Sequence, residues 1–250
     1  MPRSSPPESP PDGGFPTTHW TLIARLHSPN PTDRTRALND LCLQYHFPLY
    51  CYIRRHGLQH HDAQDALHDF LARLLRLESL ATADSEKGRL RNFLLTALQR
   101  YLITWQRGQH HRRHELSADA ERILDGAEDR YQQEQFPDTE TPDRIYQRTW
   151  AAELMQTVLV RLRCQYEVRN KLPLFDALRP VLLDGGSLRE DGSSALAAEL
   201  GIKPGTLRIA LMRLLRDYRQ VLEEEILQTV RDRQEAKEEF RELMSLFAKQ

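Results

Sequence analysis

Helical periodicity runs through almost all of this chain, and it constrains the fold more than any other sequence feature. Apolar residues recur every three or four positions, for example at Ala63, Ala66, Leu67, Phe70 and Leu74. No stretch alternates apolar and polar residues between hairpin turn signals, which is the pattern typical of strands. The sequence therefore predicts an all-α fold.

The composition is that of a folded protein without secretion or membrane signals. Hydrophobic residues make up 40% of the 250 residues and charged residues 28%, which is typical of a globular protein. The three cysteines have no motif spacing, so we expect buried free thiols in a reducing compartment. The chain starts without an apolar leader and has no run of about 18 apolar residues, which predicts a cytoplasmic protein with no membrane partner.

Composition along the chain divides it into five parts. Proline, serine and glycine dominate 1–16, which predicts a disordered tail. Amphipathic helices fill 17–114 and 142–228, and the polar, acidic stretch 115–141 between them is typical of a linker. A charged helical extension follows at 229–250. We therefore expect two helical domains joined by a polar linker.

Positive charge is concentrated in two segments of a chain whose formal net charge is -1. The first basic segment, Arg89–His114, holds six arginines and no acid. The second basic segment, Lys203–Arg219, holds five basic residues against the single acid Asp217. Two such segments in a nearly neutral chain indicate two separate anion-binding surfaces.

A cluster of histidines and acids opens the helix predicted at 62–77. His61, Asp65 and His68 share one face of that helix, and this spacing permits a metal site. A catalytic metal needs further ligands, however, and the other histidine cluster, at 110–114, is interleaved with arginines that oppose cation binding. A solvated polar face and a protein-docking face are the other two interpretations.

The most specific local signal is S-S-A-L-A-A-E-L-G-I-K-P-G-T-L-R-I-A-L-M-R-L-L at 193–215. A short helix meets a turn at Gly201, and a second helix starts near Pro204, which is the pattern of a helix-turn-helix. On the second helix Ile209 and Met212 fall on the outer face among arginines. Apolar side chains in that setting suit thymine methyl groups in a major groove, and an ordinary helical hairpin is the alternative.

The order of these parts resembles a bacterial RNA polymerase sigma factor of the sigma-70 family, of the extracytoplasmic-function type. The polymerase-docking helix of that family begins D-A-x-D with a phenylalanine a few residues later, which is similar to Asp62, Ala63, Asp65 and Phe70. Its R-x-R-x-[FW]-L motif, in the helix that recognises and melts the downstream promoter element, matches 89–94. T-H-W-T-L near the start and E-F-R-E-L near the end are also similar to a subgroup of these factors.

The resemblance implies roles for residues on three helices. The implied polymerase-docking residues are Asp62, Asp65, His68, Asp69 and Arg73. The implied contacts to the downstream promoter element are Arg89, Arg91, Asn92, Phe93, Arg100, Ile103, Thr104 and Arg107. The helix-turn-helix corresponds to the region that reads the upstream element, and the implied contacts are Lys203, Thr206, Arg208, Ile209, Met212, Arg213 and Arg216.

The resemblance thus implies a two-domain protein, with sigma regions 2 and 4, that binds core RNA polymerase and promoter DNA. An anti-sigma factor is a further candidate partner. No catalytic residue, enzymatic activity, cofactor or metal is implied. Two alternatives stay open: a helix-turn-helix regulator that acts without polymerase, and a metal-dependent hydrolase that uses His61, Asp65 and His68.

Overall fold

The computed structural model describes residues 25–26, 28–76, 89–106, 126–134, 136–187, 190–230 and 232–247. Within these ranges the chain is helical and contains no strand, which confirms the all-α prediction. The helices are α2 (Pro31–Arg55), α3 (His60–Arg76), α5 (Leu90–Gln106), α7 (Ala127–Gln133), α8 (Pro142–Val168), α9 (Leu172–Leu183), α10 (Glu190–Glu199), α11 (Pro204–Thr229) and α12 (Arg233–Phe247). None of these helices is long and apolar enough to cross a membrane.

Helix α2 has well-defined ends and packs against both α3 and α8. The side chain of Asn30 accepts a hydrogen bond from the Thr32 amide at 3.0 Å, and Pro31 occupies the first helical position. The helix ends just before Gly57, whose φ of +90° is a left-handed conformation that glycine adopts without strain. These two signals fix the length of the first long helix.

Helices α3 and α5 bury the apolar faces that the periodicity predicts. The buried residues of the α3 face are Ala63, Ala66, Leu67, Phe70 and Leu74. On α5 the predicted stripe is buried at Leu90, Leu94, Leu98 and Tyr101 and half-buried at Trp105. Because α3 packs on α2 and α5 packs on α3, the polar faces of both helices point away from this core.

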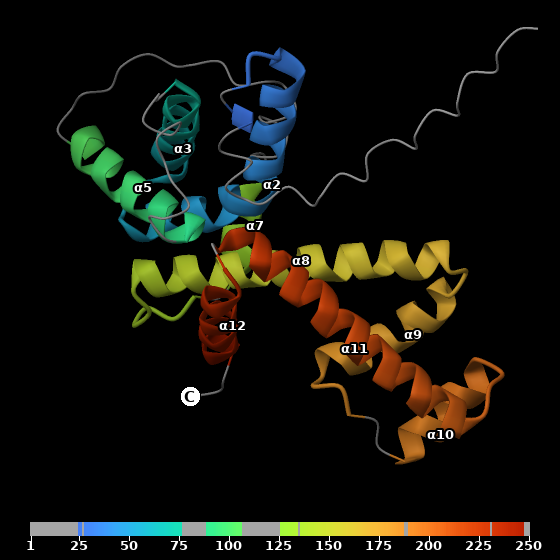
Figure 1. The fold of residues 1–250 in the computed structure, drawn as a ribbon. Coiled ribbons are helices and arrows are strands. Elements are labelled where there is room, and N and C mark those ends of the chain that lie inside the picture. Colours follow the sequence, from blue (N-terminus) through green and yellow to red (C-terminus); the bar gives the residue numbers. More distant parts are fainter. Residues whose placement is uncertain are drawn as a thin grey trace, which may run out of the picture.

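Helix α8 links the two parts of the molecule (Figure 1). Near its start the Tyr146 ring lies 6.3 Å from that of Tyr52 on α2, and near its end the Tyr166 ring lies 5.6 Å from that of Phe175 on α9. Buried residues on both sides of residue 142, where the sequence predicts the start of a second domain, belong to one hydrophobic cluster, because α8 packs against helices of both parts.

Helices α9, α10 and α11 gather around the C-terminal part of α8 (Figure 1). Gly201, with φ of +64°, forms the turn between α10 and α11, where the Ile202 amide donates to the Ala197 carbonyl at 2.9 Å. After α9, Gly186 has a φ of +73°, and an added Cβ would lie 2.8 Å from Leu215 Cδ2, so the leucine side chain would have to move. Helix α12 then turns back from α11 and packs against α8 and α11.

Candidate nucleic-acid and partner surfaces

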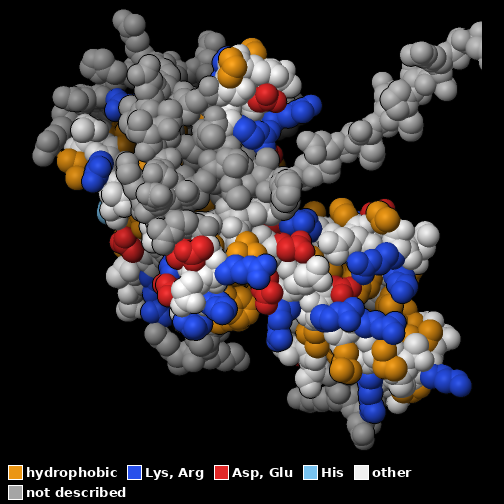
Figure 2. Space-filling model, in the orientation of Figure 1, with side chains coloured by type: hydrophobic (Ala, Val, Ile, Leu, Met, Phe, Trp, Pro, Cys, Tyr) orange, Lys and Arg blue, Asp and Glu red, His pale blue; other side chains and the backbone are white. Residues whose placement is uncertain are grey.

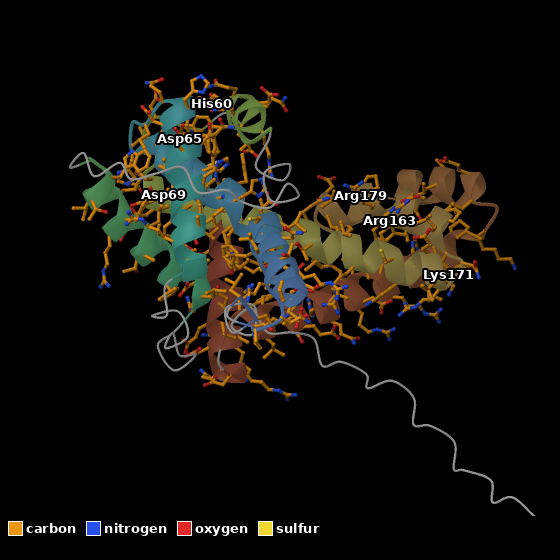
Figure 3. All side chains as sticks on the ribbon, turned by 90° about the horizontal axis from the view of Figure 1, so that it is seen from above. His60, Asp65, Asp69, Arg163, Lys171 and Arg179 are labelled. Atoms are coloured by element: carbon orange, nitrogen blue, oxygen red, sulfur yellow. The ribbon has the colours of Figure 1, made fainter. Side chains whose placement is uncertain are left out.

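The N-terminal turns of α3 present an exposed acidic surface. Asp62 and Asp65 are exposed, whereas His68 is half-buried. Figure 3 shows His60, Asp65 and Asp69 in order along this helix. Two carboxylates on one exposed turn can pair with cations of a partner protein, and the underlying α3–α2 packing fixes their position.

Asp69 and Arg73 join α3 to α5. Asp69 is 7% exposed, accepts a hydrogen bond from the Tyr101 hydroxyl at 2.9 Å and pairs with Arg73 Nε at 3.2 Å. The Arg73 guanidinium lies 5.1 Å from the centre of the Tyr101 ring, and burial together with the Asp69 hydrogen bond raises the pKa of that tyrosine. The interpretation of Asp69 as an exposed docking acid is therefore wrong, because α5 packs over it.

A polar cluster that the sequence did not predict holds α7 against α2 and α3. The Tyr50 hydroxyl donates to Glu128 and lies 2.9 Å from His60 Nδ1, and Arg54 Nε is 3.1 Å from the same carboxylate. Burial alone would raise the pKa of Glu128, but hydrogen bonds from Tyr50 and Gln132 and the charge of Arg54 lower it. The cluster fixes part of the predicted linker in place.

The outer face of α5 mixes polar and apolar side chains. Of the residues predicted to contact the downstream element, Asn92, Arg100 and Ile103 are exposed and Phe93 and Thr104 are half-buried. Ile103 is exposed to 52%. Arg107 lies outside the described residues. A large exposed apolar side chain close to an arginine is an arrangement that an unstacked base can cover.

Two carboxylates of α12 bind the arginines at the N-terminal end of α5. Arg91 donates from Nε and Nη2 to the two oxygens of Glu239, at 2.6 and 2.8 Å, and from Nη2 to Glu242 at 2.7 Å. Arg89 lies 2.9 Å from Glu239 and also pairs with Glu242. We call these four residues the Arg–Glu cluster. Because 148 residues separate Arg91 from Glu239, no local sequence pattern could predict the pair.

The inner half of the Arg–Glu cluster is closed to solvent. Arg91 is 4% exposed and Glu239 is 0% exposed. The Arg91 guanidinium lies 4.7 Å from the centre of the Trp150 ring, and the Tyr146 hydroxyl donates to the Arg91 carbonyl at 2.9 Å. Burial alone would lower the pKa of Arg91, but the hydrogen bonds and charges of Glu239 and Glu242 raise it. Arg91 therefore reaches a ligand only if α12 moves.

The outer face of α11 is open. Every residue predicted to contact the upstream element is exposed: Lys203, Thr206, Arg208, Ile209, Met212, Arg213 and Arg216. Met212 is 71% exposed and Ile209 53%. Figure 2 shows Lys and Arg side chains next to exposed hydrophobic ones over this part of the molecule. The opposite face is buried through Leu207, Leu211 and Leu214, which fixes the orientation of the helix.

A basic pocket of about 380 Å³ adjoins the outer face of α11. It lies between α8, α9 and α11 and is lined by Tyr166, Arg169, Lys171, Leu174, Ala210, Arg213, Arg216 and Asp217. Arg169 pairs with Asp217 at 2.9 Å, and Figure 3 shows Lys171, Arg163 and Arg179 at this end of the molecule. Lys171 and Arg213 thus add positive charge beside the outer face of α11, whereas Asp217 offsets part of the charge of Arg169 and Arg216.

The metal-site interpretation has no support in the described part of the chain. No group of three or more histidine, cysteine, aspartate or glutamate side chains there is placed to hold a metal ion. His61, Asp65 and His68 are among these described residues, and they do not form such a group.

The cysteines follow the prediction at two of three positions. Cys42 and Cys51 are buried free thiols, as expected, but Cys164 is exposed, so the prediction of a buried thiol is wrong there. Burial raises the pKa of Cys42 to about 12, which keeps that thiol protonated and unreactive at neutral pH. None of the three thiols in this structure is part of a disulfide.

Comparisons with known proteins add no assignment to these surfaces. No protein-family model, curated protein or solved structure matches the chain.

Proposed function

We propose that this protein is a sigma factor of the extracytoplasmic-function type, which binds core RNA polymerase and directs it to promoters. One observation carries the proposal: Ile209 and Met212 are exposed between Arg208, Arg213 and Arg216 on the outer face of α11. A major groove offers thymine methyl groups to the apolar side chains and phosphates and guanine edges to the arginines. In this function α10 and α11 act as a helix-turn-helix, with α11 as the recognition helix.

The acidic surface of α3 supports the polymerase-docking part of the proposal. Asp62 and Asp65 are exposed on a helix that α2 supports from behind. Asp69 and Arg73 contribute indirectly in this function, because their contacts with Tyr101 set the position of α5 relative to α3. Docking through α3 then fixes where the outer face of α5 lies relative to the polymerase.

In the proposed mechanism, binding energy alone opens the promoter. The outer face of α11 sets the position on duplex DNA through phosphate contacts and base contacts. Arg100 and Ile103 on α5 then hold an unstacked base of the separated strand. Capture of such a base shifts the duplex equilibrium toward the open state, so the chain needs no catalytic residue and no cofactor.

The test is promoter-directed transcription by purified core polymerase with and without the full chain. We expect the parent to co-purify with core polymerase, and the double variant Asp62→Arg/Asp65→Arg to lose this binding while it keeps its helicity. The matched control Asp129→Arg/Glu134→Arg reverses two exposed acids on and next to α7 and should retain binding. Specific duplex binding without any effect of polymerase would instead favour a helix-turn-helix regulator.

A further inference from the structure

The Arg–Glu cluster removes the leading arginines of the first basic segment from the charged surface. Two guanidinium groups, Arg89 and Arg91, face two carboxylates, Glu239 and Glu242, so the cluster carries no net charge. Bidentate pairing to Glu239 occupies the same guanidinium edge with which arginine binds a phosphate. Helix α12 thus presents its carboxylates where a nucleic-acid backbone would place phosphates.

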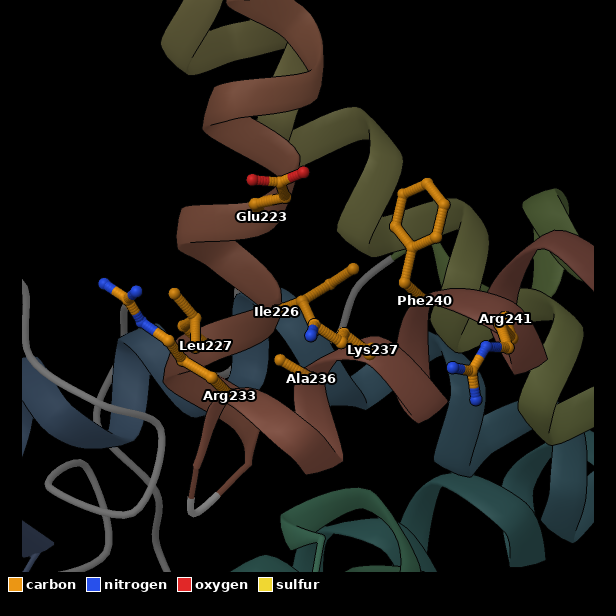
Figure 4. Close-up of a pocket in the computed structure, with 8 residues that line it drawn as sticks. All are labelled: Glu223, Ile226, Leu227, Arg233, Ala236, Lys237, Phe240 and Arg241. Atoms are coloured by element: carbon orange, nitrogen blue, oxygen red, sulfur yellow. The ribbon is translucent and has the colours of Figure 1, made fainter.

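Few apolar side chains hold α12 in place. Among its described side chains Leu243 is buried, and Ala236, Phe240 and Leu246 are half-buried against the core. A pocket of about 520 Å³ lies between the end of α11 and the start of α12 (Figure 4). The pocket is lined by Glu223, Ile226, Leu227, Arg233, Ala236, Lys237, Phe240 and Arg241. Loose packing at this junction leaves the Arg–Glu cluster as the main polar attachment of α12 to α5.

We infer that α12 is an internal competitor of DNA, whose carboxylates occupy Arg89 and Arg91 until nucleic-acid phosphates replace them. This inference rests on the proposed function, because it assigns the regulation of the same downstream DNA surface. A buried arginine that loses its partner is strongly destabilised, so simple release of α12 is unfavourable. Exchange of a carboxylate for a phosphate keeps both guanidinium groups paired. The closed state, with α12 in place, and the open state, with α12 displaced by DNA, then differ little in electrostatic energy.

The closed and open states differ in the charge that the first basic segment presents. With α12 in place, the exposed outer face of α5 presents Arg100 from this segment. With α12 displaced, Arg89 and Arg91 lose their carboxylate partners at the N-terminal end of α5 and become available to phosphates. The protein alone therefore binds single-stranded DNA weakly, and displacement of α12 couples downstream DNA binding to a change at the C-terminal end of the chain.

Substitution of both Glu239 and Glu242 in the full chain tests whether α12 competes with DNA. The probe is a fluorescein-labelled single-stranded DNA of 20 nucleotides, and the readout is fluorescence anisotropy at several salt concentrations. We expect Glu239→Gln/Glu242→Gln to bind about tenfold more tightly, the gain expected if about a tenth of parent molecules are open. The salt dependence should steepen by about 1.4 in log–log slope, about 0.7 for each added phosphate contact.

A matched control separates release of α12 from a change in net charge. Glu223→Gln/Glu238→Gln removes two exposed acids from α11 and α12 without touching Arg89 or Arg91. We expect the control to bind DNA within about twofold of the parent, since the ion pairs of Arg89 and Arg91 are made by Glu239 and Glu242. Hydrogen exchange should rise across Arg233–Phe247 in the cluster variant and stay at the parent level in the control.

Equal DNA affinity of the cluster variant and the control would overturn the inference that α12 competes with DNA. If the double variant does not fold, Glu242→Gln alone decides, because Glu242 is 53% exposed and its loss leaves Glu239 on both arginines. This single variant should gain about threefold in affinity, and no gain overturns the inference. Transcription by the parent with core polymerase tests the proposed function separately: a parent that directs transcription but shows no gain on substitution refutes only the competitor.

Discussion

Arg91 on α5 and Arg213 on α11 belong to the two basic segments of the chain, yet Arg91 is 4% exposed and Arg213 is exposed. Part of the difference comes from their own helices, since Arg91 falls on the buried face of α5 with Leu94 and Leu98, whereas Arg213 falls on the outer face of α11. The rest comes from α12, which lies over the N-terminal end of α5 and supplies Glu239 and Glu242. The positive charge of a segment therefore becomes a binding surface only where no acid from elsewhere in the chain neutralises it.

The same comparison extends to the aromatic and apolar residues around each arginine. The Arg91 guanidinium lies on the buried ring of Trp150, whereas Arg213 lies beside Met212, which is 71% exposed. The first arrangement stabilises the fold, and the second leaves apolar area for a partner to cover. We therefore expect substitutions around Arg91 to affect mainly stability and substitutions around Arg213 to affect mainly DNA binding.

The largest effect should follow removal of the Trp150 ring, which packs against the Arg–Glu cluster. Trp150→Ala should lower the free energy of unfolding by about 3–5 kcal/mol, because Trp150 is 2% exposed and its indole hydrogen-bonds with Tyr45. Met212→Ala on α11 should change it by less than about 0.5 kcal/mol. Urea denaturation followed by circular dichroism measures both. Similar losses for the two variants would show that α11 is covered in solution.

A smaller effect, on DNA binding, should be confined to the arginines on the outer face of α11. Arg213→Ala or Arg216→Ala should weaken binding to an upstream promoter duplex by about 1–3 kcal/mol if the arginine contacts a base in bidentate fashion. Arg89→Ala should leave binding to that duplex unchanged, because α12 already pairs this arginine. Anisotropy titrations on duplexes with single base changes provide the measurement. A loss that is equal on all sequences would identify a phosphate contact.

The buried and exposed ion pairs should differ in coupling energy. A double-mutant cycle on Arg91 and Glu239 should give a coupling of about 0.5–3 kcal/mol in unfolding free energy, as expected for buried partners in direct contact. Arg163 and Asp176, 3.8 Å apart and about half exposed, should couple by less than about 0.5 kcal/mol. A weak coupling for Arg91 and Glu239 would mean that α12 leaves the cluster open most of the time.

The smallest effect is a pH dependence that we expect only for the Arg–Glu cluster. Burial alone would raise the pKa of Glu242, but the hydrogen bonds and charges of Arg89 and Arg91 hold it below its ordinary value of 4.5. A carboxylate with a lowered pKa in the folded state contributes stability that is present above pH 4.5 and is lost as the pH falls through the folded pKa. Protection of the Arg233–Phe247 amides, measured relative to the intrinsic exchange rate at each pH, should therefore fall below about pH 4.5, ahead of protection in 204–215.

Substitution of Glu242 provides the control for this pH dependence. Glu242→Gln cannot titrate, so exchange in α12 should already be raised at neutral pH and should change less below pH 4.5 than in the parent. Identical pH profiles for α12 in parent and variant would assign the acid response to other carboxylates.

Much of the two candidate surfaces follows from helical periodicity. A period of about 3.6 residues assigns Leu207, Leu211 and Leu214 to the core, and it therefore leaves Ile209 and Met212 outside, as the structure has them. The same argument fails for Asp69. Its position in the helix puts it at the edge of the polar face, and whether an edge residue is exposed depends on the neighbouring helix, here through Tyr101.

The sequence by itself determined the all-α class and the outward residues of α11, because helical periodicity acts within a few residues. Tertiary structure alone decided that α8 belongs to both parts of the molecule and that α12 neutralises Arg89 and Arg91. Those contacts join residues up to 153 positions apart. Contacts over such separations depend on how all the helices pack together, which no local pattern encodes.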